Sequence, residues 1–204
     1  MLKFFLKSIA RLGWIAIFLL IVATLVNLFG CSNTSKSFNS IDITGVDWGK
    51  KFVLNDINSN KVDLSKFNGK VVTLFFGFLS CPDFCPNHLN KMVYLKESLE
   101  NKKKDLIVIF VSVDPERDTK TNMKNYLASF DSDFIGVIPS IEQLEGLKKE
   151  FKLVVNKVEQ PNSESYTIDH YTYTYIYDKK NNLRLLSPFN ISQKELLSDI
   201  LLLL

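Results

Sequence analysis

The sequence has few of the residues that bind metals or carry redox chemistry, with three cysteines and two histidines in 204 residues. It has no internal repeat, which excludes a repeat architecture. It also has no glycine-rich phosphate loop, so the usual sequence sign of a nucleotide site is missing. Taking Lys3, Lys7 and Arg11 from the 25 basic residues leaves 22, equal to the 22 acidic residues. This balance over residues 32–204 gives no sign of a nucleic-acid-binding protein.

Charge is missing altogether from residues 12–29, an apolar run close to the shortest length that spans a membrane as a helix. Positive charges precede this run and none directly follows it. The N-terminus is therefore expected to stay cytoplasmic, and residues 32–204 to be exported. The sequence predicts a signal or anchor segment at residues 1–31, a linker rich in Ser, Asn and Thr at residues 32–46, and a folded domain at residues 47–204.

Two kinds of membrane attachment fit the N-terminal segment. Residues 28–32 resemble a bacterial lipoprotein processing site, in which Cys31 becomes the lipidated first residue, although Phe29 is bulkier than the small residue usual there. The alternative is an uncleaved transmembrane anchor formed by residues 12–29. Both alternatives tether the domain to a cell membrane and expose it to an oxidising compartment, and both account for Cys31 without placing it in a site.

The other two cysteines lie between a predicted strand and a predicted helix. Residues 71–76 are almost entirely apolar, which is typical of a strand buried on both faces. Cys81 and Cys85 follow this run, and Pro86 is tolerated only in the first turn of a helix. We therefore expect both thiols on an irregular turn and a helix from about residue 86 to residue 100. The N-terminus of that helix should lower the pKa of at least one thiol.

Two close thiolates can form a disulfide or bind one soft metal ion, and a purely structural disulfide is the simplest alternative. An imidazole added to two thiolates suits copper and also zinc. His88 is near in sequence but lies on the predicted helix. His170 opens a predicted strand, and the loop before that strand should pack against the cysteine turn. We therefore expect His170 to be the third ligand. Asp169 can orient it or can be a simple turn residue.

The predicted elements alternate between strand and helix along most of the domain. Strands are expected at about residues 52–54, 62–64, 71–78, 106–113, 134–138, 171–177 and 183–186, helices at about 86–100, 119–130, 140–151 and 192–204, and a polar loop at 156–168. This order predicts an α/β, thioredoxin-like fold, with a mostly parallel sheet flanked by helices and a closing antiparallel strand pair. Asp114, Glu116, Arg117 and Asp118 follow one strand, where they can contact the site or cap the next helix.

Three sequence blocks together resemble the Sco (SenC) family in order and spacing. They are Phe-Phe-Gly-Phe leading to Cys-Pro-Asp-Phe-Cys-Pro at residues 75–86, Val-Ser-Val-Asp-Pro-Glu-Arg-Asp at residues 111–118, and Asp-His at residues 169–170. The resemblance covers residues 47–204. It departs from many members at residues 79–80, where Leu-Ser replaces Thr-His, and at Tyr171, where many have a small residue. Neither departure removes a ligand.

The resemblance implies a thioredoxin-like, membrane-tethered, copper-binding protein. Members of the family help to assemble the dinuclear copper centre of cytochrome c oxidase as metallochaperones, as reductants of the oxidase cysteines, or as both. The resemblance assigns copper to Cys81, Cys85 and His170. From their positions in the sequence, Asp169 and Asp114 are expected to contact those ligands. Some relatives serve copper homeostasis or redox defence, and the motif does not separate these roles.

We therefore expect a copper chaperone rather than an enzyme. Cys81 and Cys85 would bind Cu(I) as thiolates and form a redox-active disulfide once copper leaves, and His170 would help to hold Cu(II). The expected partner is the copper-site subunit of cytochrome c oxidase or another copper or thiol protein. One alternative is an envelope thiol-disulfide oxidoreductase or thiol peroxidase that uses the same two cysteines without His170. Another is an interaction module with a permanent disulfide.

Overall fold

The computed structural model describes residues 14, 17, 20–22, 37–159 and 166–204, which fall into two units, Met1–Ser37 and Phe38–Leu204. In the first unit Trp14, Ile17 and residues 20–22 have helical backbone. The rest of the predicted segment at residues 12–29 lies outside the described residues, and so does Cys31. Among the described residues, no helix is long and apolar enough to cross a membrane.

The second unit is built on a mixed six-stranded sheet with the order β1-β10-β9-β4-β5-β6. The strands are β1 Ile41–Asp42, β10 Leu183–Ser187, β9 Thr174–Tyr177, β4 Val71–Gly77, β5 Leu106–Ser112 and β6 Ile135–Val137. β4, β5 and β6 are parallel, whereas β9 and β10 close the sheet as an antiparallel pair next to β4. The predicted parallel centre with an antiparallel closing pair is therefore confirmed.

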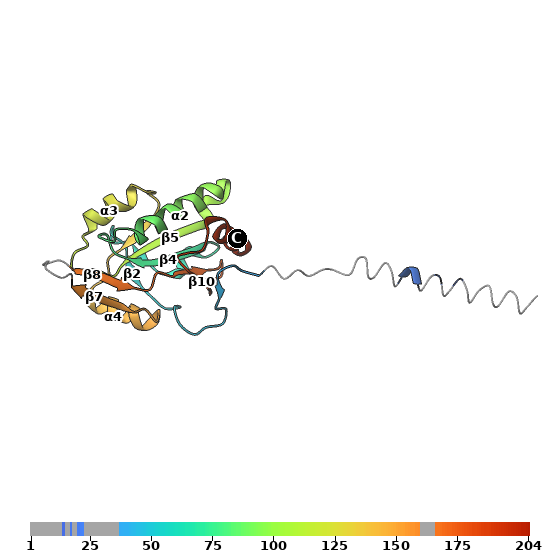
Figure 1. Cartoon of the computed structure of the whole chain (residues 1–204), viewed down its shortest axis with the longest axis horizontal. Coiled ribbons are helices and arrows are strands. Elements are labelled where there is room, and N and C mark those ends of the chain that lie inside the picture. The colour runs from blue at the N-terminus through green and yellow to red at the C-terminus, as the bar shows by residue number, and fades with distance from the viewer. Residues whose placement is uncertain (1–13, 15–16, 18–19, 23–36, 160–165) are drawn as a thin grey trace, which may run out of the picture. The chain divides into compact units, whose positions relative to one another are not determined.

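Helices cover both faces of this sheet, with α2 and α3 on one side and α4 on the other (Figure 1). Their bounds are α2 Phe84–Ser98, α3 Lys120–Ala128, α4 Ile141–Glu150 and α5 Gln193–Leu203, with short 3-10 helices η1 Leu64–Phe67 and η2 Glu100–Asp105. Two of these helices, α4 and α5, begin with a capping box. In each, the serine hydroxyl accepts a hydrogen bond from the backbone N–H of a Gln or Glu, whose side chain accepts one from the backbone N–H of the serine. The pairs are Ser140 with Gln143 and Ser192 with Glu195.

The N-terminal edge of the second unit begins earlier than the composition suggests. β1 pairs with β10, so residues 38–46 belong to the compact unit although their composition is that of a linker. Asp199 of α5 anchors this edge, because its carboxylate accepts hydrogen bonds from the backbone N–H groups of Asn39 at 2.8 Å and Ser40 at 2.7 Å. The predicted strand pair that follows is confirmed as β2 Leu54–Asn55 and β3 Lys61–Val62.

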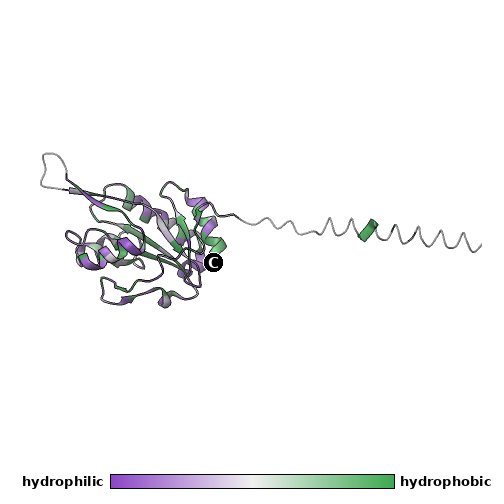
Figure 2. Cartoon of the chain, turned by 90° about the horizontal axis from the view of Figure 1, so that it is seen from below, coloured by the Kyte–Doolittle hydropathy of each residue, from purple (hydrophilic) through white to green (hydrophobic). Residues whose placement is uncertain are grey.

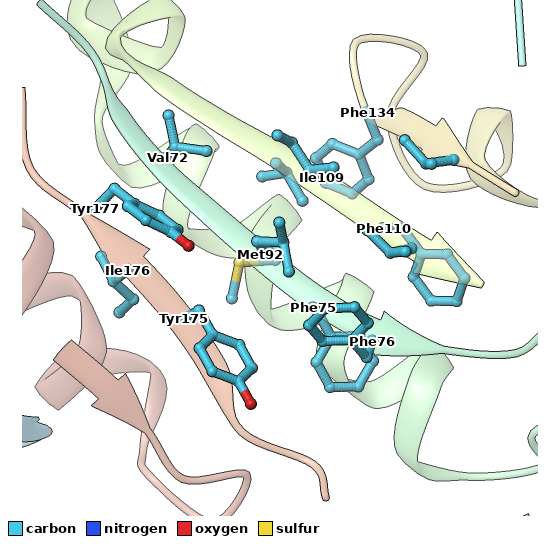
Figure 3. Close-up of a cluster of buried hydrophobic side chains, with 14 of the residues drawn as sticks. Val72, Phe75, Phe76, Met92, Ile109, Phe110, Phe134, Tyr175, Ile176 and Tyr177 are labelled. Atoms are coloured by element: carbon cyan, nitrogen blue, oxygen red, sulfur yellow. The ribbon is translucent and has the colours of Figure 1, made fainter. Parts of the chain in front are cut away.

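β4 is the centre of the core, and all seven of its residues are buried. Alternate side chains of a strand point to opposite faces. Phe76 packs against Phe151 and Tyr175, at 5.0 and 5.7 Å between ring centroids, and Phe75 contacts the ring of Phe110 at 6.0 Å. Figure 3 shows Phe75, Phe76, Phe110 and Tyr175 gathered around β4, and Figure 2 shows hydrophobic residues along strands inside the domain. An apolar run buried on both faces is what the sequence predicted.

One region contradicts the prediction. Residues 156–168 were expected to form a polar loop, but β7 Val155–Glu159 and β8 Tyr166–His170 pair as an antiparallel hairpin outside the main sheet. β7 is exposed along most of its length, so it lacks the alternating apolar pattern of a half-buried strand. His170 therefore ends β8 instead of opening the next strand, and β9 starts only at Thr174.

We expect Asp199→Ala to lower the free energy of unfolding by about 2 kcal/mol, because it leaves the buried N–H of Ser40 and the part-buried N–H of Asn39 without an acceptor. Urea unfolding of the full chain in detergent measures this change. Asp47→Ala is the matched control, since the Asp47 side chain is fully exposed and pairs only with Lys50. Equal stability of the two variants would contradict the anchoring role of Asp199.

Candidate metal centre

Cys81 and Cys85 lie at the junction between the end of β4 and the start of α2. Cys81 is in the connecting loop, and its backbone N–H donates to the carbonyl of Phe78 at 3.2 Å. α2 begins at Phe84, two residues earlier than predicted, so Cys85 is in the first helical turn instead of on the turn before it. Pro86 is still within that first turn, where its missing N–H has no helical partner to lose.

The two thiols are free and buried. The backbone N–H of Cys85 donates to Sγ of Cys81 at 3.4 Å. The thiol of Cys85 and the N–H groups at the start of α2 lower the pKa of Cys81 to about 6. The same thiol contact, together with burial, raises the pKa of Cys85. At neutral pH the pair is therefore one thiolate and one thiol, which confirms the predicted low-pKa cysteine.

Gly77, the last residue of β4, makes room for Cys85. A Cβ atom placed on Gly77 would lie 2.7 Å from Sγ of Cys85 and 2.9 Å from two ring carbons of Phe110. Any side chain at this position would therefore displace either the thiol or the aromatic ring. This role of Gly77 was not predicted from the sequence, where the available signal is a glycine that ends an otherwise apolar strand.

His170 lies beside the aromatic residues that lead into the cysteine loop. Its ring is edge-on to Phe75 and Phe78, at 6.3 and 6.0 Å between centroids. Burial lowers the pKa of His170, so its imidazole is neutral at neutral pH. Its Nδ1 lies 2.8 Å from the carbonyl oxygen of Tyr171, which can only accept a hydrogen bond. The proton is therefore on Nδ1, and Nε2 carries the lone pair that a metal ion would use.

The three expected ligands do not form a ready-made cluster. Within residues 37–159 and 166–204, no three Cys, His, Asp or Glu side chains come close enough together to hold a metal ion. The structure thus places His170 next to Phe75 and Phe78, but it does not bring the imidazole together with the two sulfurs in a metal-binding cluster. Two thiols and a neutral imidazole are a donor set that fits a soft or borderline metal ion.

His88 is a core residue. Its ring stacks on Phe75 with 3.9 Å between centroids and 16° between planes, and its Nδ1 is 3.4 Å from Oγ1 of Thr174. Burial lowers the pKa of His88 to about 3. Its position under Phe75 agrees with the expectation that the helix turns this histidine away from the ligand set.

The acidic residues after β5 lie under the cysteine loop and the hairpin. Asp118 is buried and accepts hydrogen bonds from the backbone N–H of Leu79 at 3.3 Å and from Oγ of Ser112 at 2.6 Å. Asp114 is also buried, and it accepts a hydrogen bond from the Tyr166 hydroxyl at 2.8 Å. Asp169 is exposed. Its negative charge raises the pKa of His170 and so opposes burial, which lowers that pKa.

In a Cys31→Ser chain we expect iodoacetamide to label Cys81 with a rate that rises through a midpoint near pH 6, because the thiolate is the reactive form. Cys85 should stay unlabelled at that pH, since its pKa is raised. Mass spectrometry of quenched samples locates the label, and Cys81→Ser is the control that should lose the low-pH reaction. Labelling of Cys85 first would contradict this assignment.

Comparison with known proteins identifies relatives along almost the whole chain. A SCO2-like protein of Rickettsia typhi is 32% identical over 195 residues, which cover 94% of this chain and 96% of that protein. The copper-bound structure of ScoI from Bradyrhizobium japonicum superimposes with a TM-score of 0.67 and 30% identity, covering 75% of this chain and 97% of that one. The apo Sco1 structure from Thermus thermophilus gives a TM-score of 0.71 and 30% identity over 84% of this chain and all of that one.

These matches establish the mixed α/β, thioredoxin-like fold that the order of elements predicted. The SCO1/SenC family model matches residues 42–204, which include the cysteine pair, the acidic loop after β5 and the hairpin that carries His170. The chain therefore belongs to the SCO1/SenC family.

Proposed function

We propose that this protein is a membrane-tethered copper chaperone that binds one copper ion through Cys81, Cys85 and His170. The supporting observation is the neighbouring thiolate and thiol at the start of α2, with a neutral imidazole beside the same loop. Copper is the metal in solved structures of relatives such as ScoI of Bradyrhizobium japonicum. Soft thiolates favour Cu(I), and added imidazole suits Cu(II).

Cu(I) binding needs only one change of protonation. Cys81 is already a thiolate at neutral pH, whereas Cys85 must lose its proton to become the second ligand. His170 is neutral in both states. Metal entry is therefore an exchange of one cation for one proton at the sulfur pair.

Cu(II) binding also needs the imidazole. Nε2 of His170 must move toward the sulfurs, while Nδ1–H can keep its hydrogen bond to the carbonyl of Tyr171. Transfer to an acceptor proceeds by ligand exchange, in which each acceptor ligand replaces one donor ligand. The acceptor in this proposal is the copper-site subunit of cytochrome c oxidase. The domain reaches it from the exported side of a membrane, tethered through residues 12–29 or a lipidated Cys31.

The low pKa of Cys81 also supports a second role as a thiol reductant. The Cys81 thiolate attacks a disulfide of the partner, forming a mixed disulfide and releasing one partner thiolate. Cys85 then gives up its proton and attacks Sγ of Cys81, which releases the second partner thiolate. The Cys85 proton passes to one partner sulfur, so the products are a Cys81–Cys85 disulfide and a reduced partner with one thiol and one thiolate. The same chemistry without metal binding describes the alternative thiol-disulfide oxidoreductase.

Copper titration of the reduced, full-length Cys31→Ser chain tests the chaperone proposal. We expect one tightly bound copper per chain for both Cu(I) and Cu(II), measured anaerobically against chelators of known affinity. Cys81→Ser/Cys85→Ser should abolish binding. His170→Ala should weaken Cu(II) by about 100-fold or more, because a ligand matters at least as much as the groups that orient it.

His88→Gln is the matched control, since it changes the other histidine of the chain and should leave both affinities unchanged. Weaker Cu(II) binding in His88→Gln but not in His170→Ala would overturn the ligand assignment. A chain that binds no stoichiometric copper but cycles readily between dithiol and disulfide would instead be an oxidoreductase.

Proton release gives an independent prediction. Cu(I) binding at pH 7.5 should release about one proton per chain, because only Cys85 has a proton to lose. A weakly buffered solution with a pH indicator measures the release, and His170→Ala should give the same value. Release of two protons would show that both cysteines are thiols before the metal enters.

A further inference from the structure

The loop after β5 is hydrogen-bonded to the cysteine loop. Asp118 accepts from the backbone N–H of Leu79, two residues before Cys81, at 3.3 Å. Oγ of Ser112 donates to Asp118 at 2.6 Å and accepts from the backbone N–H of Asp114 at 3.0 Å. Ser112, Asp114 and Asp118 are almost completely buried, so the bonds among them are shielded from water, and the bond from Leu79 is part-buried. They connect the turn that carries the thiols to Asp114.

Asp114 in turn is connected to the hairpin that carries His170. Its carboxylate accepts from Nε of Arg117 at 2.5 Å and from the Tyr166 hydroxyl at 2.8 Å. Arg117 also donates from Nη1 to the carbonyl oxygen of Tyr166 at 2.7 Å, and its guanidinium lies 3.6 Å from the centroid of the Tyr166 ring. We call Asp114, Arg117 and Tyr166 the Asp114 clasp.

The hairpin has few other attachments to the domain along its two strands. β7 and β8 form a separate two-stranded sheet, and Ile168 is their only buried residue. An isolated pair of strands is marginally stable, so its placement depends on contacts at particular points. Lys157 and Glu116 form an ion pair at 2.5 Å, but both side chains are about half exposed and such pairs contribute little. The Asp114 clasp is a part-buried polar attachment that adds to the packing of Ile168 in the core.

We propose that Arg117 and Tyr166 are positioning residues, which through Asp114 set where the hairpin presents His170 relative to Cys81 and Cys85. This inference rests on the proposed function, because it concerns the imidazole ligand of the same copper site. Tyr166 and His170 are the two ends of β8, so fixing one end restricts the other. Hydrogen bonds through Asp118, Ser112 and Asp114 thus link the backbone of Leu79, in the cysteine loop, to Tyr166 at the far end of β8 from His170.

Loss of the Asp114 clasp should weaken the binding of Cu(II) and leave the binding of Cu(I) unchanged. Cu(I) can be held by the two sulfurs at the start of α2, which do not depend on the hairpin. Cu(II) needs His170 and therefore needs the hairpin in place. A merely structural role for Arg117 or Tyr166 would alter stability without separating the two affinities.

The test uses the full-length Cys31→Ser chain in detergent and two conservative variants. Tyr166→Phe removes one hydrogen bond and keeps the ring, and Arg117→Lys keeps the charge and loses the paired donors. We expect each to raise the Kd for Cu(II) about tenfold. The Kd for Cu(I) should stay within about twofold, and the sulfur-to-Cu(II) absorption band should shift or weaken.

Arg184→Lys is the matched control. Arg184 pairs with Asp178 and is 27% exposed at its side chain, close to the 30% of Arg117. It should leave both copper affinities unchanged. The thermal midpoint of each copper-free variant checks that the domain remains folded.

A double-mutant cycle shows whether the clasp acts through His170. In the His170→Ala background, Tyr166→Phe should cause no further loss of Cu(II) affinity. The inference is overturned if Tyr166→Phe and Arg117→Lys leave Cu(II) binding within twofold, if Cu(I) weakens equally, or if the loss persists without His170. A parental chain that binds no copper overturns the proposed function and the inference with it.

Discussion

The contact between the Cys85 thiol and the Cys81 thiolate is the interaction on which the site depends. It exists because β4 ends in Gly77, whose missing side chain leaves room for Sγ of Cys85. It also needs α2 to begin before Cys85, so that free backbone N–H groups stabilise the charge on Cys81. A buried strand, a glycine and a helix N-terminus together make one sulfur anionic in an otherwise apolar part of the core.

Local patterns in the sequence were enough to predict the frame of the domain. The apolar runs of β4 and β5 have the composition of strands buried on both faces, and the capping boxes at Ser140 and Ser192 mark where two helices begin. The cysteine pair was found from its place between strand and helix. In each case the residues that determine the structure are neighbours in the sequence.

The features that sequence reasoning missed depend on contacts between distant residues. β7 is mostly exposed, so its composition resembles that of a loop. It is a strand because it pairs with β8. The partnership of Asp114 with Tyr166 joins residues 52 positions apart. The start of α2 was placed too late because Pro86 was taken as the first helical residue, whereas the first turn tolerates proline at its third position as well.

The unequal protonation of the two sulfurs has an electrostatic consequence. The pair carries one negative charge when it is empty, from Cys81. With Cu(I) bound by two thiolates, the charges of the metal and the second thiolate cancel, and the site again carries one negative charge. Under the proposed function, a partner protein therefore cannot use long-range electrostatic attraction to tell the empty form from the Cu(I) form. It must tell them apart by direct contact with the sulfurs, whereas Cu(II) makes the site neutral and changes its attraction at a distance.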